Sequence, residues 1–366
     1  MIHKLSSSDK IITILDRQIG FYHPTYFIAD IAANHNGSLE QAKNLIRLAK
    51  EAGANAAKFQ HFKAEKIVSR QGFELLKGKL SHQAKWKKSV FQVYQEASVP
   101  WEWTDELVRT CREVGIHFFS APYDFDSIDK LDAYMPAYKV GSGDITWWEA
   151  LTRMAQKKKP IFLATGASEM NEVKKAVQII TAINPQLCLM QCNTNYTANL
   201  ENFKYINLNV LKTYAKKFSN IVLGLSDHTL GNTTVLGAVA LGARVIEKHF
   251  TDNRKQEGPD HAFSMEPLEW KEMVARVREL ELAMGSDTKK VEENEKQSVL
   301  IQRRCCRAAA DFDRGHILKH EDIEMLRPVQ AGAFLPYEIE KLIGRKLATP
   351  ICKGSAICPS MLIRHS

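Results

Sequence analysis

The sequence has no long hydrophobic run. No stretch approaches the roughly 18 uninterrupted apolar residues that a membrane-spanning helix needs. The amino-terminal residues, Met1 to Ser6, also lack the apolar segment of a secretory signal peptide. These two absences predict a soluble, cytoplasmic protein that has no membrane partner.

Cysteine is present, but without a recognisable pattern. The seven cysteines are an odd number, and no two of them have the CxxC spacing. We therefore expect neither a disulfide framework nor a zinc ribbon, and the composition fits a reducing compartment.

Charge is not concentrated in any one tract. The 50 lysines and arginines exceed the 42 acidic residues, which gives a net charge of +8. The basic runs lack the interleaved aromatic residues that would favour nucleic-acid binding, so we expect no nucleic-acid partner. The positive excess does favour an anionic ligand.

No glycine-rich dinucleotide turn follows the first strand-like run, which argues against a doubly wound open sheet. Instead, eight runs of β-favouring residues alternate with segments whose apolar residues recur at helical spacing. The runs cover 26–31, 56–60, 116–122, 137–143, 161–166, 187–193, 221–228 and 243–250. This alternation predicts an α/β fold, a (β/α)8 TIM barrel, with its functional groups at the carboxyl ends of the strands.

The chain outside these strands predicts three further regions. Residues 61–100 are too long for a simple connection and read as a partly helical excursion over the barrel mouth, either a substrate lid or a structural insertion. The barrel domain is expected to span 1–285, followed by a charged linker at 286–298. Short apolar runs broken by turns predict a small, mostly-β domain at 299–366.

Two histidines occupy matching positions at strand ends. His228 follows the seventh strand and His249 ends the eighth. A single such histidine is as readily a packing residue, but two at adjacent strand ends favour a shared metal ion. Imidazole and oxygen ligands without cysteine are compatible with Mn, Fe, Co, Zn or Mg.

Two lysines lie within predicted strands. Lys58 and Lys139 each follow apolar residues, where an uncompensated ammonium group would be costly. One interpretation is a salt bridge to Asp30, Asp144 or Glu247. The other is that the lysines bind the phosphate and carboxylate of a substrate.

Several motifs in order resemble one family. They are Asp30-Ile31-Ala32-Ala33-Asn34-His35-Asn36-Gly37, Lys58-Phe59-Gln60, Tyr138-Lys139-Val140-Gly141-Ser142-Gly143-Asp144, Leu225-Ser226-Asp227-His228, Glu247-Lys248-His249-Phe250-Thr251 and Glu257-Gly258-Pro259-Asp260-His261. Together they resemble the sialic acid synthase (NeuB) family, and the C-terminal segment resembles its SAF, or antifreeze-like, domain. The resemblance implies condensation of phosphoenolpyruvate with an open-chain N-acetylated hexosamine to a nonulosonic acid and phosphate, assisted by Mn²⁺ or Mg²⁺.

The resemblance also implies roles for individual residues. His228 and His249 match the metal ligands, and Asp30 stands where the family usually has a catalytic glutamate. We expect catalysis from Asp30, Lys58, Lys139 and Glu247, and substrate binding by Gln60, Ser142, Asp144, Thr194, Tyr196, Ser226, Asp260 and Arg327. Arg327 matches an arginine that the family inserts into the partner's barrel, so a domain-swapped homodimer is expected.

Departures from the family pattern leave the sugar open. Asp30 is one methylene shorter than glutamate, and Ala121 and Ala164 replace hydroxyl residues of some members. The run Cys192-Asn193-Thr194-Asn195-Tyr196-Thr197 differs from the commoner Cys-Thr-Ser-x-Tyr-Pro. The alternatives are a synthase that uses a non-acetylated sugar and a non-catalytic, sugar-binding paralogue.

Overall fold

The computed structural model describes residues 10–76, 83 and 86–363. The chain divides into two compact units, residues 1–285 and 286–366. No helix in the described ranges combines the length and the hydropathy needed to cross a membrane.

The first unit is built around eight parallel strands. They are β3 (Tyr26–Asp30), β4 (Ala56–His61), β5 (His117–Pro122), β6 (Tyr138–Val140), β7 (Ile161–Ala164), β8 (Leu187–Cys192), β9 (Val222–Asp227) and β10 (Ala243–His249). Their order in the sheet is β5-β4-β3-β10-β9-β8-β7-β6, and β5 also lies against β6, which closes the barrel. The predicted (β/α)8 architecture is confirmed.

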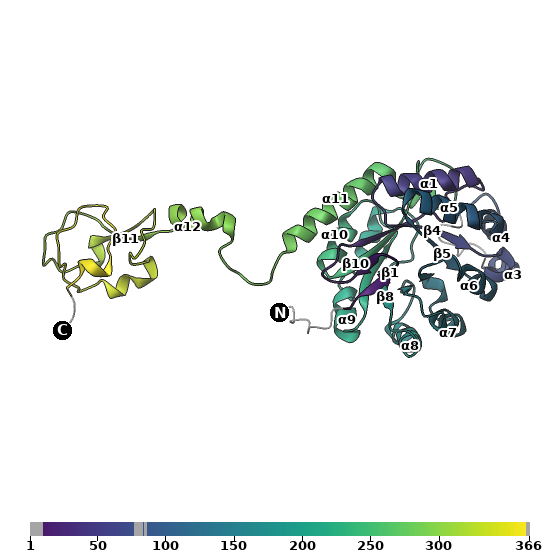
Figure 1. Cartoon of the computed structure of the whole chain (residues 1–366), viewed down its shortest axis with the longest axis horizontal. Coiled ribbons are helices and arrows are strands. Elements are labelled where there is room, and N and C mark those ends of the chain that lie inside the picture. Colours follow the sequence, from purple (N-terminus) through teal and green to yellow (C-terminus); the bar gives the residue numbers. More distant parts are fainter. Residues whose placement is uncertain (1–9, 77–82, 84–85, 364–366) are drawn as a thin grey trace. The chain divides into compact units, whose positions relative to one another are not determined.

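Helices surround these strands (Figure 1). They are α1 (Leu39–Glu51), α5 (Thr104–Val114), α6 (Phe125–Leu131), α7 (Trp148–Gln156), α8 (Met170–Thr181), α9 (Val210–Lys217), α10 (Thr233–Ala240) and α11 (Pro267–Met284). Helix α1 begins where the Ser38 side chain accepts a hydrogen bond from the Gln41 amide.

The alternation of side chains along each strand divides the barrel into two cores. On β3, Phe27 and Ala29 pack outward against the helices, whereas Tyr26 and Ile28 face the barrel interior. The interior cluster is apolar at the amino ends of the strands. Inward-facing positions near the carboxyl ends carry charged side chains instead, and they form the site described below.

A β-hairpin precedes the barrel, in a part of the chain for which the sequence predicts no strand. Strands β1 (Ile12–Ile14) and β2 (Arg17–Ile19) pair in antiparallel fashion. Ile12, Ile14 and Ile19 are buried and join the apolar interior cluster. The hairpin therefore closes the amino-terminal end of the barrel.

Strand β10 contains an irregularity that sets the direction of its side chains. Its pairing with β9 shifts between Ala243 and Val245, so Arg244 is an extra residue of the bulge type. Ala243 packs in the outer core and Val245 in the inner one. The Arg244 guanidinium fixes the bulge by donating hydrogen bonds to the carbonyl oxygens of Phe21, Val239 and Ala243.

The long connection after β4 is partly helical, as predicted. Its described residues form α2 (Ala64–Ile67), α3 (Arg70–Leu75) and α4 (Val90–Ala97). They have a small apolar cluster of their own, around Ala64, Val68 and Val90.

The second unit is small and irregular. Strands β11 (Cys305–Ala308) and β12 (Ile323–Leu326) pair in antiparallel fashion, and isolated bridges connect the surrounding turns. Its apolar cluster includes Cys306, Leu318 and Ile357. The predicted small, mostly-β domain is confirmed, although helix α12 (Lys296–Gln302) begins inside the segment expected to be a linker.

Candidate functional site

Four charged side chains meet inside the carboxyl-terminal end of the barrel. The Lys58 ammonium group lies 2.7 Å from the Asp30 carboxylate and 3.5 Å from that of Glu247. The same Glu247 oxygen lies 3.2 Å from the Lys139 ammonium group and accepts a hydrogen bond of 3.3 Å from the Ser226 hydroxyl. We call these four residues, Asp30, Lys58, Lys139 and Glu247, the ion-pair floor.

The ion-pair floor is almost completely removed from water. The side chains of Lys58, Lys139 and Asp30 are each 3% exposed and that of Glu247 is 5% exposed. Asp30 Oδ1 and Glu247 Oε2 are nevertheless buried without a hydrogen-bond partner among the described residues. Because a buried unsatisfied oxygen costs free energy, these atoms indicate that the site is completed by something else.

The two carboxylates are electrostatically different. Burial raises the pKa of Asp30, and the negative charge of Glu247 raises it further. Together these two effects outweigh the opposing effect of Lys58. Burial would also raise the pKa of Glu247, but Lys139 and Lys58 together hold it below its usual value. Glu247 is therefore the permanent anion, whereas Asp30 is suited to taking up and releasing a proton.

The two strand-end histidines lie together beside the floor. The ring centroids of His228 and His249 are 5.5 Å apart. His228 Nδ1 is 3.0 Å from the carbonyl oxygen of Asn193, which can only accept, so Nδ1 carries a proton, and Nε2 has the lone pair whenever the ring is neutral. Burial, with neighbouring cations acting in the same direction, lowers the pKa of His249 well below its usual value, so this imidazole is neutral.

These features fit a divalent ion bound by two imidazoles. His249 Nδ1 is buried without a hydrogen-bond partner, 4.0 Å from the Asp260 carboxylate. In the described part of the chain, no three histidine, cysteine, aspartate or glutamate side chains are already arranged around one point. An ion here would need ligands from substrate or water in addition to the two histidines.

Aromatic rings line the histidine side of the site. The Tyr196 ring lies 4.3 Å from that of His228 and 6.2 Å from that of His249, between centroids. Phe263 lies 4.8 Å from His249 and 5.3 Å from Tyr196. Asp260 is held at the same edge because its carboxylate accepts a hydrogen bond from the Ala33 amide.

The remaining predicted residues of the barrel lie on neighbouring strand ends. Ser142 accepts a hydrogen bond of 2.9 Å from the Gly166 amide. A side chain at Gly166 would begin 1.9 Å from the Thr194 hydroxyl, so only glycine leaves Ser142 and Thr194 in place. Gln60 shares the inward face of β4 with Lys58, two residues before it.

One predicted residue lies in the other unit. Arg327 directly follows β12 and is exposed. The barrel therefore brings together the thirteen other predicted residues, and Arg327 is considered separately below.

Residues on the opposite face of the same strands have a structural role. Asp227 and Lys248 form a 2.5 Å ion pair, and Asp227 also accepts hydrogen bonds from Thr229 and Thr234. Their neighbours His228 and Glu247 face inward. The two faces thus separate a structural ion pair from the charged interior.

Sequence reasoning missed three contributors to the site. Phe263 contacts both histidines, the Asn193 carbonyl accepts from His228 Nδ1, and the Cys192 sulfur lies 3.9 Å from the same nitrogen. Phe263 lies three residues beyond Asp260 in the sequence, and this closeness to a predicted site residue is the feature that could have indicated it. A backbone carbonyl leaves no signal in the sequence.

Replacing Asp144 by asparagine is expected to stabilise the protein at neutral pH. Burial raises the pKa of Asp144 to about 6, against the opposing effect of Lys139. The folded protein therefore binds this proton more tightly than the unfolded chain, and stability falls as the pH rises from about 4 to about 6. Asparagine removes this loss, which we expect to amount to about 2 kcal/mol after allowance for partial exposure.

Urea unfolding of Asp144→Asn and wild type near pH 4 and pH 7.5 measures the effect. The gain should be present at the higher pH and small at the lower one. Asp126→Asn, at an exposed position of α6, is the control for loss of one carboxylate. An equal gain at both pH values would contradict the titration argument.

Comparison with known proteins identifies close relatives of both units. Residues 45–289 match the NeuB family model and residues 303–363 match the SAF domain model. The chain is 32% identical to N-acetylneuraminate-9-phosphate synthase from Homo sapiens, over 95% of this chain and 96% of that protein. It is 33% identical to N,N'-diacetyllegionaminic acid synthase from Legionella pneumophila, over 91% and 93% of the two chains.

The fold is also shared with a solved structure. The crystal structure of N-acetylneuraminic acid (sialic acid) synthetase from Leptospira borgpetersenii in complex with citrate superposes with a TM-score of 0.69 at 27% identity. The match covers 80% of this chain and 95% of that one.

Proposed function

Because the chain belongs to the NeuB family and carries a C-terminal SAF domain, we propose that it is a nonulosonic acid synthase. It condenses phosphoenolpyruvate with the aldehyde of an open-chain N-acetylated hexosamine, forms a carbon–carbon bond and releases phosphate. The relatives described above support this reaction class, and the products for which they are named differ from one another. The identity of the sugar is therefore a separate question.

The observation that carries the proposal is the ion-pair floor. Two buried lysines are balanced by two carboxylates when no ligand is present, and two carboxylate oxygens lack partners. Phosphoenolpyruvate brings a phosphate and a carboxylate, and Lys58 and Lys139 would turn from protein carboxylates to these groups.

The histidine pair fits the metal that this reaction class implies. We propose that His228 and His249 hold Mn²⁺ or Mg²⁺, since one has a fixed tautomer and the other is a neutral imidazole with an orphan nitrogen. When bound, such an ion polarises the sugar aldehyde. Asp260 and Tyr196 border the same region and would orient the sugar.

The remaining chemistry is assigned to residues of the floor. Glu247 keeps both lysines in place through its contacts with each of them. Asp30, with an unpartnered oxygen, would accept the proton of the water that adds during the reaction. Its shorter side chain, in place of the family glutamate, would set that water closer to β3.

The test is an assay of phosphate release. Purified protein is incubated with phosphoenolpyruvate, Mn²⁺ and a panel of N-acetylated and non-acetylated sugars, and products are identified by mass. We expect a 3-deoxy-2-keto acid only with N-acetylated hexoses. Turnover restricted to non-acetylated sugars would overturn the substrate assignment, and absence of turnover with every sugar would favour a non-catalytic paralogue.

We further propose that Arg327 serves the barrel of a second copy in a homodimer. Its exposed guanidinium makes no ion pair or hydrogen bond with a described side chain, and such a group is suited to a phosphate or a carboxylate. A partner's arginine would explain why a barrel enzyme carries a small second unit.

A mixing experiment shows whether the Arg327 that serves a barrel comes from the partner subunit or from the same chain. Lys139→Met and Arg327→Ala are each expected to be inactive. Co-expression of the two variants should restore roughly a quarter of wild-type activity. Half of the dimers are then mixed, and each mixed dimer has one complete site of two. The two variants mixed as separately purified, non-exchanging dimers are the control. If co-expression restores nothing while both variants remain dimeric, Arg327 does not act across the dimer.

A further inference from the structure

Two cavities lie at the end of the barrel opposite the ion-pair floor. Tyr26 and His117 begin strands β3 and β5, and Asn55 directly precedes β4, so the residues that line these cavities mark the amino ends of the strands. The smaller cavity measures about 480 Å³ and the larger about 690 Å³. Both have the dimensions of small-molecule sites.

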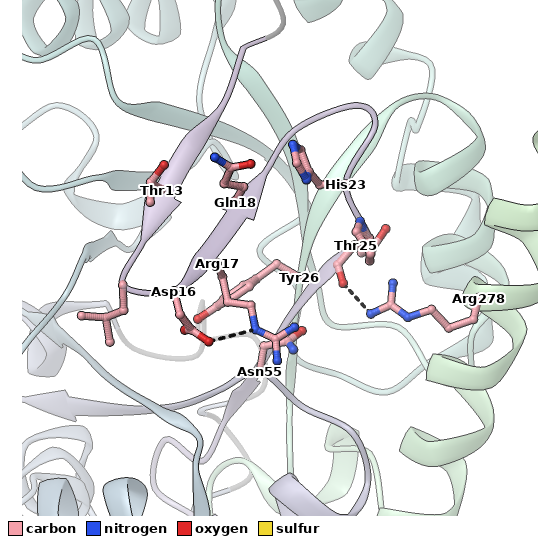
Figure 2. A pocket seen from close by; sticks show the side chains of 11 residues that line it. Thr13, Asp16, Arg17, Gln18, His23, Thr25, Tyr26, Asn55 and Arg278 are labelled. Atoms are coloured by element: carbon pink, nitrogen blue, oxygen red, sulfur yellow. Dashed lines mark hydrogen bonds and ion pairs between the residues drawn. The ribbon is translucent and has the colours of Figure 1, made fainter.

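The hairpin turn at Asp16 and Arg17 lines both cavities. Figure 2 shows the smaller one, with Asp16, Arg17 and Asn55 on one side and Arg278, bonded to Thr25, on the other. The larger cavity is also lined by Asp16, Arg17 and Asn55. We call the larger one the lower cavity.

Positive side chains outnumber carboxylates in the lining of the lower cavity. Arg17, Lys50, Arg112 and Lys159 line it, against the single carboxylate of Asp16. Lys159 is paired with Asp132, which lies outside the lining. Three cations therefore remain to be balanced by one carboxylate.

These three cations are weakly engaged by the protein. Arg17 is 3.8 Å from Asp16, with both side chains more than half exposed. Arg112 makes no ion pair or side-chain hydrogen bond with a described residue, and Lys50 donates to the Gly115 carbonyl oxygen. An exposed ion pair of that length contributes little, so these side chains retain donors for a ligand.

Helix ends account for only part of this arrangement. Lys50 and Arg112 lie in the last turns of α1 and α5, where a cation complements the helix dipole. Arg17 lies in a strand of the hairpin, so no helix dipole explains its position. Three elements distant in the sequence thus bring cations to one cavity.

Most of the remaining lining is apolar or aromatic, although Asn55 and His117 also contribute. Val108, Ile116, Phe118, Tyr134 and Met135 contribute to it. A ligand that satisfies both parts of the lining carries a compact anionic group and a flat or apolar body. Guanidinium groups match phosphate oxygens in geometry as well as in charge.

We propose that the lower cavity is a second ligand site, distinct from the catalytic mouth, that binds a phosphate monoester with an aromatic or apolar body. Arg17, Lys50 and Arg112 hold the phosphate, and the surface around Tyr134 and Met135 receives the body. The site does not depend on the proposed reaction at the other end of the barrel.

Isothermal titration calorimetry with adenosine 5′-monophosphate, adenosine and inorganic phosphate as separate probes tests the proposal. We expect the monophosphate to bind with a Kd below about 1 mM, and adenosine and phosphate to bind at least tenfold more weakly. Arg17→Ala and Arg112→Ala should each weaken the monophosphate by about tenfold or more, since each removes a charge-assisted contact.

Two controls locate the binding. Arg47→Ala removes an exposed arginine of α1 that does not line the cavity, and it should leave the affinity unchanged. Lys139→Met alters the ion-pair floor and should also leave it unchanged. Binding lost in Lys139→Met but kept in Arg17→Ala would place the ligand at the mouth and overturn the proposal, as would absence of binding by the wild type.

Discussion

Replacing Lys139 by methionine is expected to lower kcat/KM for phosphoenolpyruvate by about a thousandfold, equivalent to about 4 kcal/mol of transition-state stabilisation. Lys139 is 3% exposed and its ammonium group pairs with Glu247. Methionine keeps the length of the side chain but brings no charge to a phosphate or carboxylate. The loss should therefore affect the anionic substrate more than the sugar.

The fold should survive this change. Glu247 retains Lys58 at 3.5 Å and the Ser226 hydroxyl at 3.3 Å, so no carboxylate is left without a partner. Removal of one partner of a buried ion pair costs about 3–5 kcal/mol when the other charge is left uncompensated, and the remaining contacts of Glu247 reduce that cost. We expect the melting temperature to fall by no more than about 10 °C.

Steady-state kinetics with phosphate detection, together with thermal unfolding, measures both quantities. Lys174→Met is the matched control, because Lys174 is an exposed lysine of α8 outside the site. If Lys139→Met retains kcat/KM within threefold of wild type, the floor does not bind the anionic substrate.

Replacing His228 or His249 by alanine is expected to lower the affinity for Mn²⁺ by at least about a hundredfold. Loss of a group that only hydrogen-bonds to a metal ligand already costs about 10–100-fold in metal affinity, and loss of the ligand itself should cost more. Each histidine supplies one of the two imidazoles that are proposed to hold the ion. Activity should fall in parallel and should recover only partly at high Mn²⁺ concentration.

Titration of metal-stripped protein with Mn²⁺, followed by electron paramagnetic resonance, measures binding without turnover. His320→Ala, at an exposed position of the second unit, is the control for loss of one imidazole. Unchanged Mn²⁺ binding in both variants, with full activity, would exclude the histidine pair as the metal site.

The strands of the barrel were predictable because each is a compact run of β-favouring residues bounded by turns. The hairpin of β1 and β2 was missed because its strands are three residues long and expose half of their side chains. Only the recurrence of Ile12 and Ile14 indicated a buried face. Strand β6 is shorter than predicted because Ser142–Asp144 form a 3-10 turn.

The strand-end rule was also sufficient to assemble the site in the barrel. It could not decide which carboxylates pair with the lysines, because that choice depends on neighbouring strands. The structure pairs Lys58 with Asp30 and Glu247, and Lys139 with Glu247, whereas Asp144 makes neither pair. The contact of Phe263 with both histidines depends on the path of a loop, for which the sequence carries no periodic signal.

The bulge at Arg244 has a consequence for how this protein can change over evolution. Glu247, Lys248 and His249 are consecutive, and only the phase set by the extra residue turns the first and third inward. Deletion of Ile246, with the bulge and the pairing of Val245 kept, would exchange the two faces of the strand beyond it and present the Lys248 ammonium group to the interior in place of a carboxylate and an imidazole. Loops of a barrel tolerate insertions and deletions. The number of residues between the bulge and Glu247 must stay constant, because it decides which side chains of β10 face the site.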